Sequence, residues 1–497
     1  MLRILGSKKT LCNGVTRRDL LQIGSLGALG VGLDETFRQQ SAQAESPRDQ
    51  SKAKACILLF LFGSPPQHET FDPKPEAPRE IQGELGAIST SVPGVQIGEG
   101  LPKIAKVADR LTIVRSMTHP FPVHGVAYAL TGMPTYTPAI EARPRDPQHW
   151  PFIGSVVEYL EAQRTGRANR EMPRNIGLPW QFGTRGTIPT LAGPYGAFLG
   201  PRYDPLWTDF TGEGKQVAPK LNDKQTEEVR DPFLSTSLSG KLQLSSACQL
   251  PEDVPSGRLD ARRLLLQQFD QARPMLDQAA SVRTFSSNQQ RAFSLVTSNR
   301  VRQALDLDRE SSTLRDAYGK NLFGQACLAA RRLVEAGAKF VSIFWDPYGP
   351  FGGSVWDTHA NHFPRLKNYL LPVFDQSYST LIQDLEQRGL LDSTLVLCTS
   401  EHGRTPKIDS KPIGAARHHW SRAYSSVFAG GGMAAGKVVG RTDATAGDVV
   451  DTAISPKDMQ ATAYSLLGFK PTSYMPDRAG RPHFIAGDGH VRSELLG

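Results

Sequence analysis

Residues 55–63, ACILLFLFG, form a run without a single polar side chain. A strand with one wet face shows polar residues at alternate positions, so this run predicts a strand that is covered on both faces. Further strand candidates lie at 111–115, 340–345 and 394–399. Doubly covered strands belong to mostly parallel sheets with helices on either side. The chain is therefore predicted to be α/β, a three-layer α/β/α sandwich around a mostly parallel sheet.

The spacing of apolar residues predicts helices between and after these strands. Residues 365–388 repeat Leu and aromatic side chains at helical intervals between the third and fourth strands, which gives a right-handed crossover. Residues 456–467 follow a capping serine, Ser455, and end at Gly468. Residues 208–257 are polar and irregular, and 258–335 have a helical pattern. We predict one domain, 55–497, with a partly helical insertion at about 208–335 on the sheet edge.

Polar side chains follow the predicted strands. His68 and Glu69 come after the first strand, His119 after the second, and Glu401 and His402 after the fourth. In open α/β sheets, ligands bind beyond the carboxyl ends of the strands. These side chains are therefore expected to meet at one rim of the sheet.

Imidazole and carboxylate groups are concentrated in WDTHANH (356–362), EHGRTP (401–406) and RHHW (417–420). Five of the eleven histidines lie between His359 and His419. Neutral imidazole together with carboxylate suits zinc or another first-row divalent ion. We predict a site for one or two ions, with zinc favoured and calcium or manganese as alternatives. The candidate ligands are Asp357, His359, Glu401, His402 and His419, then Glu69, with His362 in the same segment.

The spacing leaves alternatives open within this set. Asp357 and His359 are two residues apart, so they leave an extended loop on the same side and can reach one ion. Glu401 and His402 are adjacent and point in opposite directions in extended backbone, so one binds the ion and the other supports it or serves a second ion. His418 and His419 pose the same choice. Any single histidine is otherwise a surface or hydrogen-bonded residue.

Three residues are candidates for contact with a reacting anion. His124 precedes the small-residue helix VAYALTG, whose N-terminus can hold an anion. A covalent intermediate, if one forms, would use His124 or Thr70, although Thr70 could instead close a turn through its hydroxyl. Arg404 either clamps the anion with two hydrogen bonds or pairs with Glu401.

The N-terminus carries an export pattern. Lys8 and Lys9 precede TRRDLL (16–21), an apolar stretch runs to Leu33, and 42–44 offer a small-residue cleavage site. The apolar stretch has 14 residues and four glycines, whereas a bilayer demands roughly 20 apolar residues. We predict a twin-arginine signal peptide at 1–44, a linker at 45–54 and a periplasmic or extracellular protein without a transmembrane segment. Because the segment is basic, a mitochondrial-type or uncleaved N-terminal helix is the alternative.

Charge and motifs exclude several classes of protein. Removal of residues 1–44 takes away six basic and three acidic residues and lowers the formal net charge from +8 to +5, with no basic run suited to nucleic acid. The glycine-rich stretch before Lys437 resembles a P-loop, but Val438 stands where Ser or Thr must bind Mg²⁺. The usual motifs of serine hydrolases, zincins and formylglycine sulfatases are missing. The four remaining cysteines, Cys56, Cys248, Cys327 and Cys398, suggest no disulfide framework.

Several motifs follow one another along the chain: LLFLFGSPPQHETFDPKP, LTIVRSMTH, HGVAYALTG, WDTHANHF, TSEHGRTP, RHHW and DRAGRPH. Together with the leader they resemble domain-of-unknown-function family 1501, exported bacterial proteins related to the alkaline phosphatase and sulfatase superfamily. The resemblance implies an alkaline-phosphatase-like sandwich with one or two ions at the sheet rim. By motif, Asp357 and His359 resemble ligands of one metal, Glu401 and His402 a pair that splits between two metals, and His419 a late single ligand. The superfamily's nucleophile has no clear counterpart.

These observations predict an exported, metal-dependent hydrolase of phosphate or sulfate esters. The metal would polarise the ester and lower the pKa of a bound water to roughly 7, which removes the need for a protein nucleophile. The expected partner is an anionic ester, including sulfated or phosphorylated saccharides, and no nucleic acid. The alternative is a non-catalytic envelope or polysaccharide-binding protein on the same scaffold.

Overall fold

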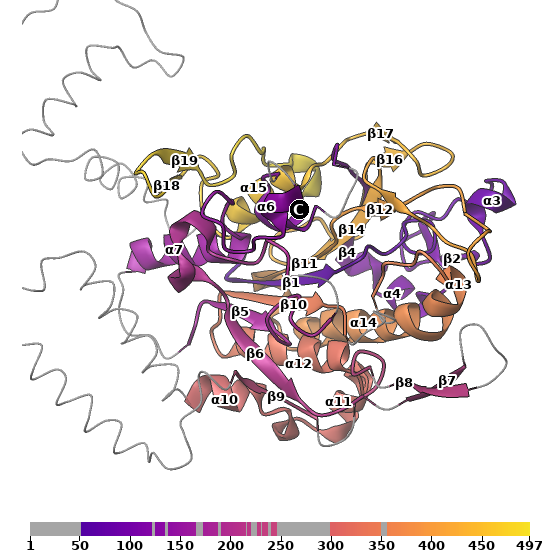
Figure 1. The fold of residues 1–497 in the computed structure, drawn as a ribbon, viewed down its shortest axis with the longest axis horizontal. Helices are drawn as coiled ribbons and strands as arrows, with labels where there is room; N and C mark the ends of the chain where they lie inside the picture. Colours follow the sequence, from indigo (N-terminus) through magenta and orange to yellow (C-terminus); the bar gives the residue numbers. More distant parts are fainter. Residues whose placement is uncertain are drawn as a thin grey trace, which may run out of the picture.

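A nine-stranded sheet forms the centre of the computed structural model (Figure 1). The structure describes residues 51–121, 125–134, 138–165, 172–186, 190–214, 216–219, 226–229, 231–236, 240–245, 299–348 and 355–497. The strand order is β15 (Lys437–Val439), β4 (Leu111–Met117), β14 (Tyr424–Ala429), β11 (Thr394–Thr399), β1 (Ala55–Leu61), β10 (Phe340–Trp345), β5 (Asn175–Leu178), β6 (Leu206–Thr211) and β9 (Lys241–Leu244). Within these residues only β14 and β9 run against their neighbours. The prediction of a mostly parallel sheet is confirmed.

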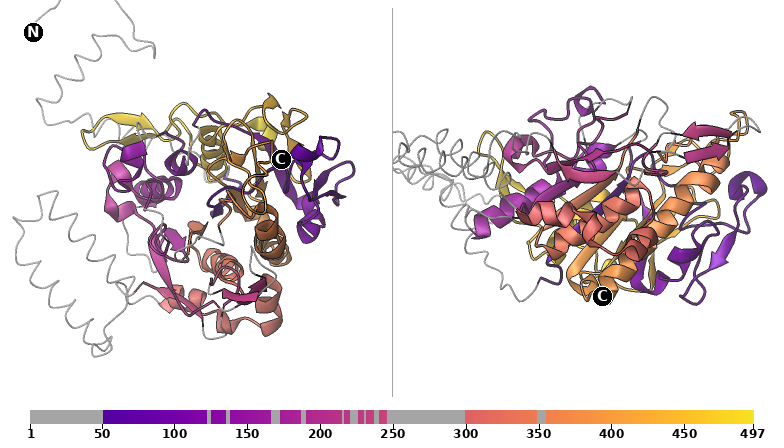
Figure 2. Two further views of the ribbon diagram at one scale, coloured as in Figure 1. Left: turned by 45° about the vertical axis from the view of Figure 1, so that its right-hand side comes forward. Right: turned by 90° about the horizontal axis from the view of Figure 1, so that it is seen from below.

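Strand β1 shows why the fold needs a layer of helices on each side. Its residues Ile57, Leu59 and Leu61 join the core beneath α12 (Leu322–Glu335) and α14 (Leu371–Gln387). The alternate residues, Cys56, Leu58 and Phe60, join a second core with α7 (Ile153–Thr165) and α15 (Pro456–Leu466). Figure 2 shows the two layers of helices around the sheet. The continuous apolar run thus reports burial on both faces, and the three-layer sandwich is confirmed.

The two predicted helices are present, and one is interrupted. The helix predicted at 365–388 starts three residues earlier, as α13 (His362–Arg365). It widens into a π-helical turn (Leu366–Leu370) and continues as α14. The wide turn precedes Pro372, which lacks the N–H that a regular helix would use. Helix α15 starts with a capping box, in which the Ser455 side chain accepts a hydrogen bond from the Asp458 N–H.

The parts of the predicted insertion that are described lie at the sheet edge and on one face. Strands β6 and β9 extend the sheet, and α10 (Asn299–Leu305) and α11 (Ser312–Tyr318) lie beside α12 (Figure 1). Residues 246–298 lie outside the described residues, as does the predicted signal peptide. Small strand pairs complete the chain: β2 (Ala87–Ser89) with β3 (Gln96–Gly98), β7 (Gln216–Pro219) with β8 (Thr226–Val229), β12 (Gly403–Arg404) with β13 (His419–Trp420), β16 (Arg441–Thr442) with β17 (Val449–Asp451), and β18 (Tyr474–Pro476) with β19 (Pro482–Phe484). The short helices are α3 (Arg79–Gln82), α4 (Pro102–Ala105), α5 (Val126–Thr131) and α6 (Pro138–Glu141).

Among the described residues, no helix combines the length and the apolar character needed to cross a bilayer. The cysteines of β1, α12 and β11 are buried and free, as expected for thiols that act as small apolar side chains.

Candidate metal centre

The carboxyl ends of β1, β10 and β11 lie together, because the three strands are parallel neighbours. The loop after β10 is anchored by Trp356, which is fully buried and packs edge-to-face on Trp345 and Phe374. The backbone N–H of Trp356 donates to the Phe62 carbonyl (3.2 Å), which holds the next residues of the loop against the end of β1.

Gly63 makes this close approach possible. Its φ is +93°, and a Cβ at this position would lie 2.3 Å from the backbone nitrogen of Asp357. No other residue type fits both the backbone angle and the space. The sequence therefore places the Asp357 loop directly on the end of the central strand.

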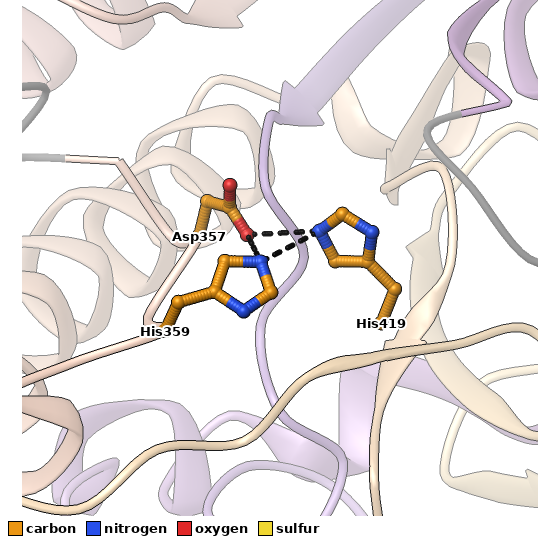
Figure 3. A group of neighbouring side chains, drawn as sticks. All are labelled: Asp357, His359 and His419. Atoms are coloured by element: carbon orange, nitrogen blue, oxygen red, sulfur yellow. Dashed lines mark hydrogen bonds and ion pairs between the residues drawn. The ribbon is translucent and has the colours of Figure 1, made fainter. Parts of the chain in front are cut away.

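Three donor atoms converge at this point (Figure 3). Asp357 Oδ1 lies 2.9 Å from His359 Nε2 and 3.1 Å from His419 Nε2, and the two imidazole nitrogens are 2.9 Å apart. Asp357 and His359 come from the loop after β10, and His419 comes from β13. Six candidate ligands were predicted, Glu69 included, and the structure brings these three of them to one place.

The chemistry and spacing of the three atoms fit one divalent ion. A carboxylate and two imidazoles are a common ligand set for first-row metals, and an ion at about 2.0–2.2 Å from each atom can touch all three corners of so small a triangle. The relative exposures of the Asp357, His359 and His419 side chains are 18%, 41% and 19%, so one side of the centre remains open to solvent. No second group of at least three convergent donors occurs among the described residues.

Arg404 supports the carboxylate of this group. Its buried guanidinium donates to Asp357 Oδ1 at 2.6 Å, and its other N–H groups donate to the carbonyls of Gly63, Ser64 and Arg417. Burial lowers the pKa of Arg404 from its usual value, and the charge of Asp357 opposes that shift. The prediction offered an anion clamp or a pair with Glu401. In the structure Arg404 is paired with Asp357, which lies in the loop after β10, and its role as an anion clamp stays a prediction.

Two more imidazoles surround the three converging atoms. His418 Nδ1 lies 2.9 Å from His359 Nδ1, and the His418 side chain is 46% exposed. His402 is buried, with its ring centroid 4.5 Å from that of His419, and its Nδ1 donates to the Gly403 carbonyl (2.9 Å). When a histidine binds a metal through one ring nitrogen, a neighbouring group usually holds its other ring nitrogen. His418 contacts Nδ1 of His359 in this way and so orients the His359 ring.

Glu401, His402 and Glu69 were predicted as ligands, and the structure does not bring them to the three atoms. The Glu401 carboxylate accepts hydrogen bonds from the Gly63 N–H (2.8 Å) and the Ser400 hydroxyl (2.8 Å), so it ties the end of β11 to that of β1. Glu69 is fully buried in an ion pair with Arg417 at 2.6 Å. Both carboxylates are thus held in structural contacts and do not join the three converging atoms.

The remaining predicted residues have structural contacts or lie outside the described residues. The Thr70 hydroxyl donates to the Pro66 carbonyl (2.7 Å), which is the contact that the turn-closing alternative requires. His119 Nε2 donates to the Glu401 carbonyl (2.6 Å), and burial lowers the pKa of His119. His124 is outside the described residues.

The family model described as "Protein of unknown function (DUF1501)" matches residues 53–496. The chain belongs to the DUF1501 family. No curated protein matches it.

Solved structures that resemble this DUF1501 protein include three hydrolase- and synthase-class enzymes. The sulfatase PsFucS1 from Pseudoalteromonas sp. is 13% identical, with a TM-score of 0.36 over 88% of this chain and 72% of its own. The lipoteichoic acid synthase LtaP from Listeria monocytogenes is 9% identical, with a TM-score of 0.33 over 89% and 83%. The phosphonate monoester hydrolase SpPMH from Silicibacter pomeroyi is 10% identical, with a TM-score of 0.34 over 89% and 76%. At these values the overlays do not assign a function to the DUF1501 chain.

Sequence reasoning missed the buried residues that support the centre of this DUF1501 protein. Arg417 and Thr358 lie directly beside ligand-type residues in sequence, and both are fully buried. An arginine next to two histidines reads as a surface residue, so only the fold shows that it is enclosed.

Proposed function

We propose that this protein is a divalent-metal-dependent hydrolase of phosphate or sulfate esters, with the ion held by Asp357, His359 and His419. The observation that carries the proposal is the convergence of their three donor atoms within 3.1 Å of one another. A hydrogen bond needs only two atoms close together, whereas a shared cation needs all of its ligand atoms within reach of one point. The ester class follows the resemblance of the sequence motifs to the alkaline phosphatase and sulfatase superfamily.

The charges around the centre favour an anionic substrate. A divalent ion bound by one carboxylate and two neutral imidazoles leaves one positive charge, and the Arg404 guanidinium lies at the same carboxylate. A local positive potential attracts and orients anions. His359 and His418 are the exposed members of the group, so the ester would approach the centre from their side.

Each protein side chain then has a separate task. The bound ion would act as a Lewis acid for the ester oxygen and lower the pKa of a water molecule. Asp357 would be kept charged and oriented by Arg404, and His359 would be oriented by His418. Thr70 is given no covalent role, because its hydroxyl donates to a backbone carbonyl. A covalent role of His124, which lies outside the described residues, is not part of the proposal.

The substrate class and the cellular location are part of the proposal. The positive centre suits phosphorylated or sulfated saccharides as well as simpler esters. Export by the twin-arginine route rests on the residues TRRDLL and the short apolar stretch after them. A periplasmic or extracellular hydrolase would meet such esters outside the cytoplasm.

Metal analysis combined with a substrate screen tests the proposal. The purified wild-type protein should contain one ion per chain and turn over at least one aryl phosphate or aryl sulfate. His359→Ala should lose both the ion and the turnover, because only two of the three protein ligands remain. His490→Ala, at an exposed histidine near the C-terminus, is the matched control and should retain both. Absence of the ion would overturn the metal site, and a bound ion without turnover of any ester would favour the non-catalytic binding protein.

A further inference from the structure

The two segments that carry the converging atoms are joined by a fully buried group of side chains. Asp357 and His359 lie in one segment, and His419 lies in the other, some 60 residues later. Between them lie Glu69, Thr358, His362 and Arg417, each with 0% relative exposure. None of these four belongs to the three converging donors.

One arm of this group runs from Glu69 to the segment of His419. Arg417 Nε and Nη2 donate to Glu69 Oε1 at 3.0 and 2.6 Å. Arg417 also donates to the carbonyls of Ile81 (2.6 Å) and Thr405 (3.0 Å). Because Arg417 is two residues before His419, its guanidinium fixes the start of β13.

The other arm runs from Glu69 to the segment of Asp357 and His359. Glu69 Oε2 lies 3.5 Å from His362 Nε2, and His362 Nδ1 lies 2.7 Å from the hydroxyl of Thr358. Thr358 stands between the two ligand-type residues of that segment. The backbone N–H of Arg417 donates to the Thr358 carbonyl at 3.4 Å, so the two segments are also joined directly.

Glu69 is charged where these arms meet. Burial alone would raise its pKa, but the nearby Arg417 and His362 lower the pKa to about 2. The ion pair holds Arg417 in one geometry, because a buried guanidinium that moved away from Glu69 would leave two buried charges without each other. The contact with His362 sets the position of that ring on the other side of the carboxylate.

We infer that Glu69 is a positioning residue whose carboxylate sets the distance of His419 from Asp357 and His359, and so sets the affinity of the centre for its ion. The inference rests on the proposed metal site. It replaces the sequence prediction that Glu69 is itself a ligand. Outer partners of metal ligands typically contribute 10- to 100-fold to metal affinity.

The test compares metal affinity in variants of two buried ion pairs. Glu69→Gln removes the charge at nearly constant volume and should weaken the binding of Zn²⁺, measured by competition with a chelator, by about 10- to 100-fold. Asp384→Asn is the matched control: Asp384, in α14, is also a buried carboxylate, and it accepts a hydrogen bond from Arg331 of α12 (2.8 Å). It should lower thermal stability and leave the Zn²⁺ affinity unchanged.

A second variant and a second measurement protect the test against misfolding. Thr358→Val keeps the shape of the side chain, removes the hydroxyl that contacts His362, and should also weaken Zn²⁺ binding. In Co²⁺-loaded Glu69→Gln the visible absorption bands should shift, because the ligand geometry changes. A wild-type protein that binds no metal would refute the proposed function. A wild-type protein that binds Zn²⁺ no more tightly than Glu69→Gln and Thr358→Val, or an equal loss in Asp384→Asn, would refute the inference about Glu69.

Discussion

At the scale of single residues, Gly63 lets the end of β1 approach the Asp357 loop of the proposed metal centre. A Cβ there would lie 2.3 Å from the Asp357 nitrogen, so Gly63→Ala must push the Asp357 loop outward. We expect a loss of Zn²⁺ affinity of about tenfold or more, by analogy with changes around metal ligands. Gly337→Ala supplies the control, because Gly337 has a similar φ of +106° with nothing within 4 Å. It should cost about 1–2 kcal/mol in unfolding free energy and leave metal binding intact. Equal metal affinity in both variants would contradict the assigned role of Gly63.

A buried histidine beside the centre should make the protein sensitive to acid. Burial, together with the charge of Arg417, lowers the pKa of His68 from 6.5 to about 3. Between these values the unfolded chain binds a proton that the folded chain does not, so stability falls as the pH drops below about 6.5. From pH 7 to pH 5 this residue should cost about 2 kcal/mol.

Denaturant unfolding of the metal-free protein measures this loss. In His68→Gln the amide can still donate to the Thr445 carbonyl, as His68 Nε2 does at 2.8 Å, but it does not titrate. The difference in unfolding free energy between wild type and variant should therefore shrink by about 2 kcal/mol from pH 7 to pH 5. A difference that stays constant would show that His68 is protonated in the folded state as easily as in the unfolded one.

At the scale of secondary-structure elements, the sequence predicts what depends on local pattern. Strands β10 and β11 match the predicted ranges, because full burial requires uninterrupted apolar residues. The pair β12–β13 has two residues in each strand and no detectable pattern, yet it aligns Arg404 with His419. The closeness of His419 to Asp357 could therefore be expected only from the general rule that strand ends meet at one rim.

The same limit explains which candidate ligands could be placed together from the sequence. Asp357 and His359 are brought together by their spacing, which is visible in the sequence. Glu69 and Glu401 carry the right chemical group, but their partners Arg417 and Gly63 come from segments more than 330 residues away. Whether a carboxylate joins the three converging atoms or a separate structural contact is decided by such long-range partners, so residue type alone could not separate the two cases.

At the scale of the whole molecule, the proposed metal centre requires the folded chain, because its atoms come from the loop after β10 and from β13. The predicted twin-arginine route carries proteins that are already folded, so the ion should be bound before export. Replacement of Arg17 and Arg18 by lysine should keep the protein in the cytoplasm, with the N-terminal segment uncleaved and one ion per chain. Cell fractionation and metal analysis of the retained protein measure both effects, and His359→Ala in the same background should be retained without the ion. Export of the double-lysine variant would refute the route, whereas a retained, folded and metal-free protein would show that the ion is acquired after export.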